Sequence, residues 1–188
     1  HDKKVLVENP DMNMTNALLL FAACTSLAPT AMAATGHAHE HGVASLNVAR
    51  SGGSLLIELD GPLDNFVGFE HAPRNAEQKR RLADALAILR EPARVVNLPA
   101  AAACRLVDVA VAEPFAEKPG AAHEAGDENH ADLEANWHFE CANAAALDGF
   151  EVTLFKHFPR LGKLRVQVAG DGGQSAQTLR PASARVGF

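Results

Sequence analysis

The sequence lacks an excess of positive charge. Lys and Arg together number 17 against 23 Asp and Glu, which gives a formal net charge of -6. A nucleic-acid partner requires a basic face that neutralises phosphates, so this balance argues against one.

Several other patterns are missing. After residue 34 no apolar run reaches the length that a membrane span needs. There is no His-Glu-x-x-His motif and no evident general base at a fixed spacing, which argues against a metalloenzyme. The 188 residues are nevertheless 47% hydrophobic, enough for one globular domain with a core of its own. We find no internal repeats.

The front of the chain has the pattern of an export segment. Residues 17–33 form an apolar run that ends in a helix breaker and small residues at Ala31 and Ala33. We expect cleavage after Ala33, so that residues 1–33 are a signal peptide with upstream residues and 34–188 are one exported domain. The true translation start stays open, because a start at Met12 or Met14 would leave no charge before the apolar run. Cys24 as a lipoprotein cysteine is the rival interpretation, and Phe21 stands where leucine is usual.

The domain opens with alternating histidines in Gly36-His37-Ala38-His39-Glu40-His41-Gly42. Neutral imidazole nitrogen is a preferred ligand of zinc and similar metals. If this stretch is extended, all three rings lie on one face. The alternative is a flexible tail that binds metal only adventitiously.

Two cysteines remain once the export segment is removed, Cys104 and Cys141. An even pair in an exported chain predicts a disulfide, which would stabilise the fold by about 4 kcal/mol on the chain-entropy model. The alternative is a pair of zinc thiolates. An oxidising compartment disfavours it, and neither cysteine belongs to a CxxC pair.

The rest of the chain predicts an α+β fold, with an antiparallel sheet or sandwich, one main helix and one disulfide. A hairpin is expected around Ser51-Gly52-Gly53, and a helix from about Ala76 to Arg90 with Asn75 as its N-cap. A short helical turn is expected within 95–103. Further strands are expected at 105–112, 133–141, 150–158 and 164–169, with 174–179 as an edge. Residues 113–131 read as a flexible acidic loop that carries His123 and His130.

Several segments resemble one known family. They are His39-Glu40-His41-Gly42-Val43-Ala44, Leu46-Asn47-Val48, Gly68-Phe69-Glu70-His71-Ala72-Pro73-Arg74, the Cys104 segment, His130-Ala131-Asp132, Phe139-Glu140-Cys141-Ala142-Asn143, Phe155-Lys156-His157-Phe158-Pro159 and Gly173-Gln174-Ser175-Ala176. They are similar to ZrgA-like proteins over essentially the whole domain. The resemblance implies a periplasmic zinc-binding protein of proteobacterial zinc uptake that delivers metal to an ABC-type importer. Family members commonly carry a long His/Asp tract, which here has shrunk to a few residues around His123 and His130.

On this basis we expect a non-enzymatic, monomeric protein that captures Zn²⁺, although nickel or copper could occupy the same imidazoles. The predicted metal ligands are His39, His41, His71 and His130, with His37, Asp132 and His123 as auxiliary ligands. Glu70 and His71 could instead cap the connector ahead of the helix. His138 and His157 are expected to be surface or packing residues, and Glu134 or Glu140 could orient an imidazole. The alternatives are a zinc-buffering or structural exported domain without a dedicated importer and, less favoured, a metalloenzyme.

Overall fold

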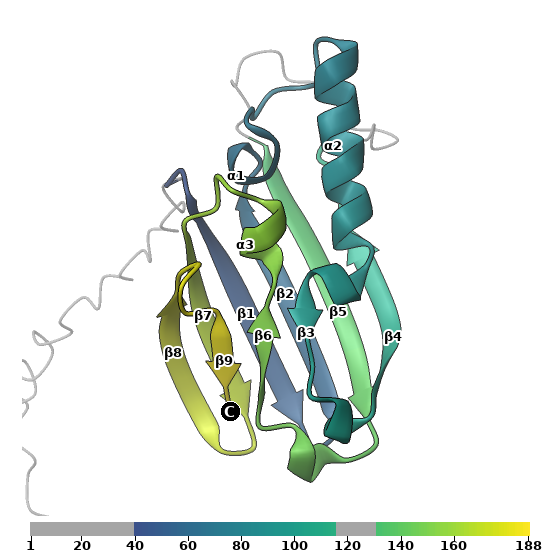
Figure 1. Ribbon diagram of the computed structural model, residues 1–188, viewed down its shortest axis with the longest axis vertical. Helices are drawn as coiled ribbons and strands as arrows, with labels where there is room; N and C mark the ends of the chain where they lie inside the picture. The colour runs from purple at the N-terminus through teal and green to yellow at the C-terminus, as the bar shows by residue number, and fades with distance from the viewer. Residues whose placement is uncertain (1–39, 116–130) are drawn as a thin grey trace, which may run out of the picture. The chain divides into compact units, whose positions relative to one another are not determined.

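The computed structural model describes residues 40–115 and 131–188, which form two β-sheets and a few helices (Figure 1). The strands are β1 (Val43–Ser51), β2 (Ser54–Pro62), β3 (Val96–Asn97), β4 (Cys104–Val111), β5 (Asp132–Cys141), β6 (Gly149–Val152), β7 (Lys163–Gly170), β8 (Gly173–Leu179) and β9 (Arg185–Gly187). The α-helices are α1 (Asp64–Val67), α2 (Ala76–Leu89) and α3 (Leu154–His157). Three 3₁₀ turns span Pro92–Arg94, Ala100–Ala102 and Ala144–Ala146.

The larger sheet has six strands in the order β4-β5-β2-β1-β7-β8, and the smaller has the order β3-β6-β9. Every pairing is antiparallel except that of β1 with β7, which is parallel. The predicted α+β class with mainly antiparallel sheets is therefore confirmed. The parallel pair was not expected from a hairpin order of strands. A parallel neighbour needs a long crossover, and here residues between β2 and β7 supply it.

The local signals placed the central hairpin and the main helix correctly. Strands β1 and β2 pair from Ser51 opposite Ser54, and Gly52 takes a φ of +55° that favours glycine in the turn. Helix α2 begins after Asn75, whose side chain accepts a hydrogen bond from the Gln78 amide at 2.9 Å.

The core lies on one face of the six-stranded sheet, which α2 and the three-stranded sheet cover (Figure 1). Strand β5 buries every second residue, as its alternation predicted. Trp137 on that strand is fully buried, and its indole Nε1 donates to the Leu89 carbonyl at the end of α2 at 2.8 Å. This bond satisfies one of the carbonyls that a helix C-terminus leaves without a partner.

One local expectation was wrong. Residues 150–158 are not one strand, because β6 ends at Val152 and α3 follows it. The short helical turn expected within 95–103 is confirmed as the 3₁₀ turn Ala100–Ala102, and β3 precedes it. The strand expected at 105–112 is β4, in which a register shift lies between Leu106 and Asp108 and Val107 is 44% exposed.

The expected disulfide is present and joins Cys104 of β4 to Cys141 of β5, the last residue of its strand. Two bonded sulfurs cannot act as zinc thiolates, so the alternative role of the cysteines is excluded in this state. Within the described ranges, we find no helix whose length and apolar character would let it cross a membrane.

Candidate metal centre

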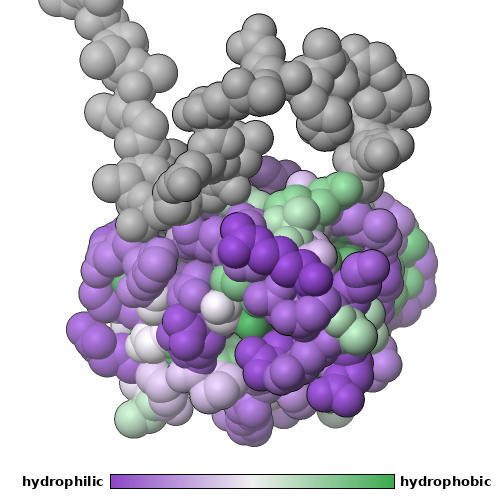
Figure 2. Space-filling view, turned by 90° about the horizontal axis from the view of Figure 1, so that it is seen from above, coloured by the Kyte–Doolittle hydropathy of each residue, from purple (hydrophilic) through white to green (hydrophobic). Residues whose placement is uncertain are grey.

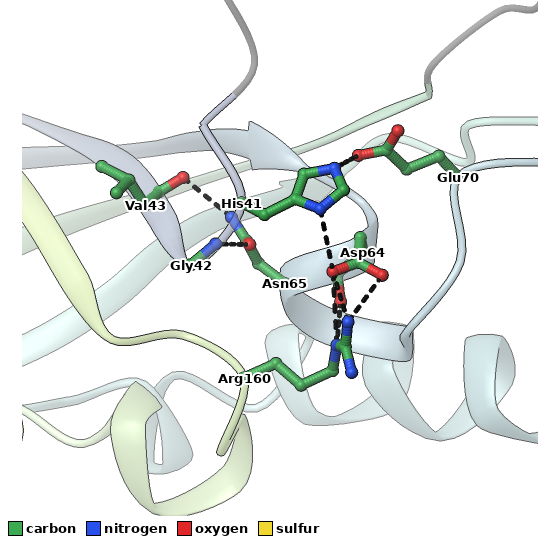
Figure 3. Close-up of polar contacts among 7 residues, drawn as sticks. All are labelled: His41, Gly42, Val43, Asp64, Asn65, Glu70 and Arg160. Carbon is green, nitrogen blue, oxygen red and sulfur yellow. Dashed lines mark hydrogen bonds and ion pairs between the residues drawn. The ribbon is translucent and has the colours of Figure 1, made fainter.

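The chain entering β1 is fixed by a buried side chain of α1. The Asn65 side chain is fully buried; its Oδ1 accepts from the Gly42 amide at 2.5 Å and its Nδ2 donates to the Val43 carbonyl at 2.8 Å. The Gly42 carbonyl accepts from the amides of Gly162 and Lys163, each at 2.9 Å. Both the amide and the carbonyl of Gly42 are therefore hydrogen-bonded. These bonds fix the backbone next to His41, from which its side chain extends (Figure 3).

The residue before His41 is held by charge. The Glu40 carboxylate pairs with Arg165 and with the Lys163 ammonium, whose Nζ lies 3.5 Å away. The hydrogen bond from Arg165, with the positive charge of Lys163, lowers the pKa of Glu40 below its ordinary value of 4.5. Glu40 is thus a fixed anion beside β7.

The His41 ring lies between two carboxylates (Figure 3). Its Nε2 is 3.1 Å from Glu70 Oε1, and its Nδ1 is 3.9 Å from Asp64 Oδ2. The His41 side chain is 63% exposed, whereas both carboxylate side chains are only 11% exposed. An exposed imidazole ring therefore lies between two carboxylates that are largely buried.

Asp64 is also bound by Arg160, which follows α3. The guanidinium Nη2 donates to Asp64 Oδ1 at 2.9 Å and to Oδ2 at 2.7 Å, and Nε donates to the Asp64 carbonyl at 3.0 Å. This fork neutralises much of the Asp64 charge and fixes the orientation of the carboxylate.

The Glu70 side of the ring has the spacing of two ligands on one zinc ion. With bonds of about 2.1 Å and a tetrahedral angle, two zinc ligand atoms lie about 3.4 Å apart. The distance from His41 Nε2 to Glu70 Oε1, 3.1 Å, is close to this value, whereas the 3.9 Å at Nδ1 is not. Among the described residues no group of three His, Cys, Asp or Glu side chains has metal-binding geometry, and His41 with Glu70 is a pair of two such side chains.

The other predicted ligands fall into two groups. His37, His39, His123 and His130 lie outside the described residues. His71 and Asp132 lie within them. The His71 ring stacks on Phe69 with centroids 5.4 Å apart, and its Nδ1 is 2.9 Å from the Ala72 carbonyl. Asp132 begins β5 opposite Pro62. The structure thus brings His41 to Glu70, and the whole predicted ligand set, His41 included, stays a prediction.

Both histidine-bearing segments nevertheless join the described fold close to Glu70. Ala131, which follows His130 in the chain, donates its amide to the Glu70 carbonyl at 3.2 Å, and its own carbonyl accepts from Leu63. On the other side, Glu40 and His41 follow His39. Glu70 is therefore the residue next to which the two segments attach.

Sequence reasoning missed four residues that build this centre: Asp64, Asn65, Glu70 and Arg160. Glu70 stood beside His71 in the sequence, but it was considered only as a cap of the connector. The other three carry no local signal, because their roles come from contacts with partners 22 to 96 residues away.

His138 lies within β5 and His157 ends α3. His138 Nε2 is 2.9 Å from Ser54 Oγ and 3.4 Å from Glu140 Oε1, on strands β2 and β5. His138 and Glu140 are, like His41 and Glu70, an imidazole beside a carboxylate. His138 is therefore a suitable control position for substitutions of His41.

The described surface at the end of the sheet that carries α1 is mostly hydrophilic (Figure 2). An ion is a better match for such a surface than an apolar ligand.

A family model described as ZrgA family zinc uptake protein matches residues 38–188. A comparison with curated proteins gives no match. Because the matched range covers well over half of the sequence, the chain belongs to the ZrgA family of zinc uptake proteins.

Proposed function

We propose that this protein is exported to the periplasm, captures Zn²⁺ there and presents it to an ABC-type importer without catalysing a reaction. Membership of a zinc uptake family supports the zinc role. The apolar segment at residues 17–33 supports export. The importer as recipient follows from the resemblance of the sequence to periplasmic zinc carriers.

One observation carries the zinc assignment, the approach of His41 Nε2 to Glu70 Oε1 at 3.1 Å. Nitrogen from imidazole and oxygen from carboxylate are both ordinary zinc ligands. The hydrogen-bonded backbone at Gly42 fixes where the His41 side chain begins, and the low exposure of Glu70 limits the movement of its carboxylate. A donor pair that needs little rearrangement loses little entropy when it binds.

A structural zinc ion usually has four ligands, so two more are needed. We propose that they come from the predicted set, with His39 and His130 first, His71 next, and His37, His123 and Asp132 as auxiliary ligands. The described contacts of Glu40 and Ala131 support this choice, because these residues attach the histidine-bearing segments beside Glu70. Imidazole and carboxylate ligands without thiolate also suit a carrier that must release its metal, since thiolates bind zinc more persistently.

The test is zinc titration of the metal-free domain, residues 34–188, by calorimetry. We expect stoichiometric binding. His41→Ala and Glu70→Gln should each weaken it by about tenfold or more, equivalent to about 1.4 kcal/mol. The double variant His39→Ala with His41→Ala should weaken it further.

The matched control is His138→Ala, which removes an imidazole that also lies beside a carboxylate but on another part of the sheet. Its zinc affinity should equal that of the unaltered domain. Full affinity in both His41→Ala and Glu70→Gln would refute this site. Equal losses in all three variants would show that the titration reports general surface binding.

A further inference from the structure

The unused nitrogen of His41 faces Asp64. If zinc binds at Nε2 beside Glu70, as proposed above, the Nδ1 atom carries the ring proton. Zinc-bound imidazoles almost always donate that second N–H to a carboxylate, a carbonyl or water, which fixes the ring and strengthens the metal bond. In the structure the group nearest to this role is Asp64, with Oδ2 at 3.9 Å from Nδ1.

Asp64 is held more firmly than the ring it faces. Its side chain is 11% exposed, it begins α1, and Arg160 binds both of its oxygens. The His41 side chain is 63% exposed, so the ring can move while the carboxylate stays. A shift of about 1 Å brings Nδ1 to hydrogen-bond distance of Oδ2.

We propose that Asp64 is a positioning residue for zinc: it accepts the Nδ1 proton of His41 and thereby directs the Nε2 lone pair to the metal. Arg160 has an opposing effect. Its guanidinium holds Asp64 in place but also withdraws part of the negative charge and adds a positive charge near the bound cation. This inference rests on zinc capture at His41 and Glu70 and extends it to the residues behind the ring.

The geometry disfavours Asp64 as a direct ligand of the same ion. Glu70 and Asp64 lie at the two different nitrogens of one imidazole, which point to opposite sides of the ring (Figure 3). One ion bound at Nε2 cannot also reach a carboxylate at Nδ1. Asp64 therefore acts on zinc through the ring.

Substitutions of Asp64 and of Arg160 should change the zinc affinity in opposite directions. In calorimetric titrations of the metal-free domain, Asp64→Ala should lose about tenfold or more in affinity, the usual effect of removing such a partner. Arg160→Gln should bind zinc about twofold to fivefold more tightly, because it leaves the carboxylate and removes a positive charge. If Asp64 only stabilised the fold through its ion pair, both variants would lose affinity alike, and that result would overturn the proposal.

If Asp64→Ala does not fold, Asp64→Asn replaces it. The amide keeps the shape and a neutral acceptor oxygen, so we expect a smaller loss of affinity than for alanine and again the opposite sign to Arg160→Gln. Full affinity in the folded Asp64 variants would overturn the proposal.

A second readout observes the ring directly. In the ¹⁵N NMR spectrum of the zinc-loaded domain, His41 should show a proton on Nδ1 and metal on Nε2. The Nδ1 proton should move upfield in the Asp64 variant and keep its position in a His138→Ala control. Metal on Nδ1 would overturn the proposal.

The outcomes also separate this inference from the proposed function. Absence of zinc binding, or full affinity in both His41→Ala and Glu70→Gln, defeats the proposed site itself. Loss in those two variants with full affinity in the Asp64 variants defeats only the positioning role.

Discussion

At the scale of single residues, His41 owes its position to its neighbours. Gly42 has a φ of +81°, a conformation that favours glycine, and both its amide and its carbonyl are hydrogen-bonded. Asn65 carries no charge and its side chain binds backbone atoms of Gly42 and Val43, so it determines where β1 begins. The ring is therefore placed by backbone contacts, and its own exposed side chain remains available for a ligand.

Glu40 makes the stability of the folded domain depend on pH. Its pKa is lower in the folded protein than in the unfolded chain, so the folded state binds the proton less readily. The resulting stabilisation is present at neutral pH and is lost as the pH falls below 4.5 through the lowered pKa. Glu40→Gln should therefore be less stable than the unaltered domain at pH 7, and the difference should be smaller at pH 3.

Urea unfolding at both pH values measures this difference. Because Glu40 is at the surface, added salt should reduce it at pH 7. A difference that is the same at both pH values would show that the ion pairs with Arg165 and Lys163 contribute nothing to stability.

At the scale of elements, the short helix α1 organises the centre. Its Phe66 packs edge-on against Phe158 with ring centroids 5.1 Å apart, and both rings are buried. Phe158 lies two residues before Arg160, so this packing brings the guanidinium to Asp64 on the same helix. A four-residue helix is too short to be stable alone, and its apolar side holds it in place.

Strand β4 depends on the disulfide more than the other strands of its sheet do. It is an edge strand, most of its residues are exposed, and its register with β5 shifts near Leu106. Replacing Cys104 and Cys141 by alanine should lower the free energy of unfolding by up to about 4 kcal/mol, because the unfolded chain loses a cross-link over 37 residues. Hydrogen exchange should quicken in β4 before it does in β1 and β2.

Thermal unfolding with and without reductant provides the same comparison in the unaltered chain. Equal melting temperatures and equal exchange in β4 would contradict the prediction.

At the scale of the whole molecule, zinc binding must raise the free energy of unfolding. A ligand that binds only the folded state stabilises it by about 2.7 kcal/mol when its free concentration is one hundred times the Kd. The melting temperature of the domain should therefore rise with zinc and fall back with chelator, and the shift should shrink in His41→Ala and Glu70→Gln. Equal melting temperatures with zinc and with chelator would favour a structural exported domain whose histidines are incidental.

The fold was predictable wherever a pattern is local. The glycine turn between β1 and β2, the cap of α2 by Asn75 and the alternation of β5 each depend on residues within a few positions of one another. The parallel pairing of β1 with β7 was not predictable in this way, because it joins segments about 120 residues apart and depends on which strand edge remains free. The prediction of a single strand at 150–158 was wrong for a related reason. A short apolar run fits a strand or a buried helical turn equally well.

The sequence by itself determined the chemistry of this protein: a histidine-rich entry to the domain, two cysteines able to pair, and a net negative charge. Only the tertiary structure decided that His41 meets Glu70 and Asp64, and that Arg160 binds the second carboxylate. The physical reason is that a ligand type is a property of one side chain, whereas a site is a set of distances. Those distances are set by the packing of α1 against the core and by a strand pairing between distant parts of the chain.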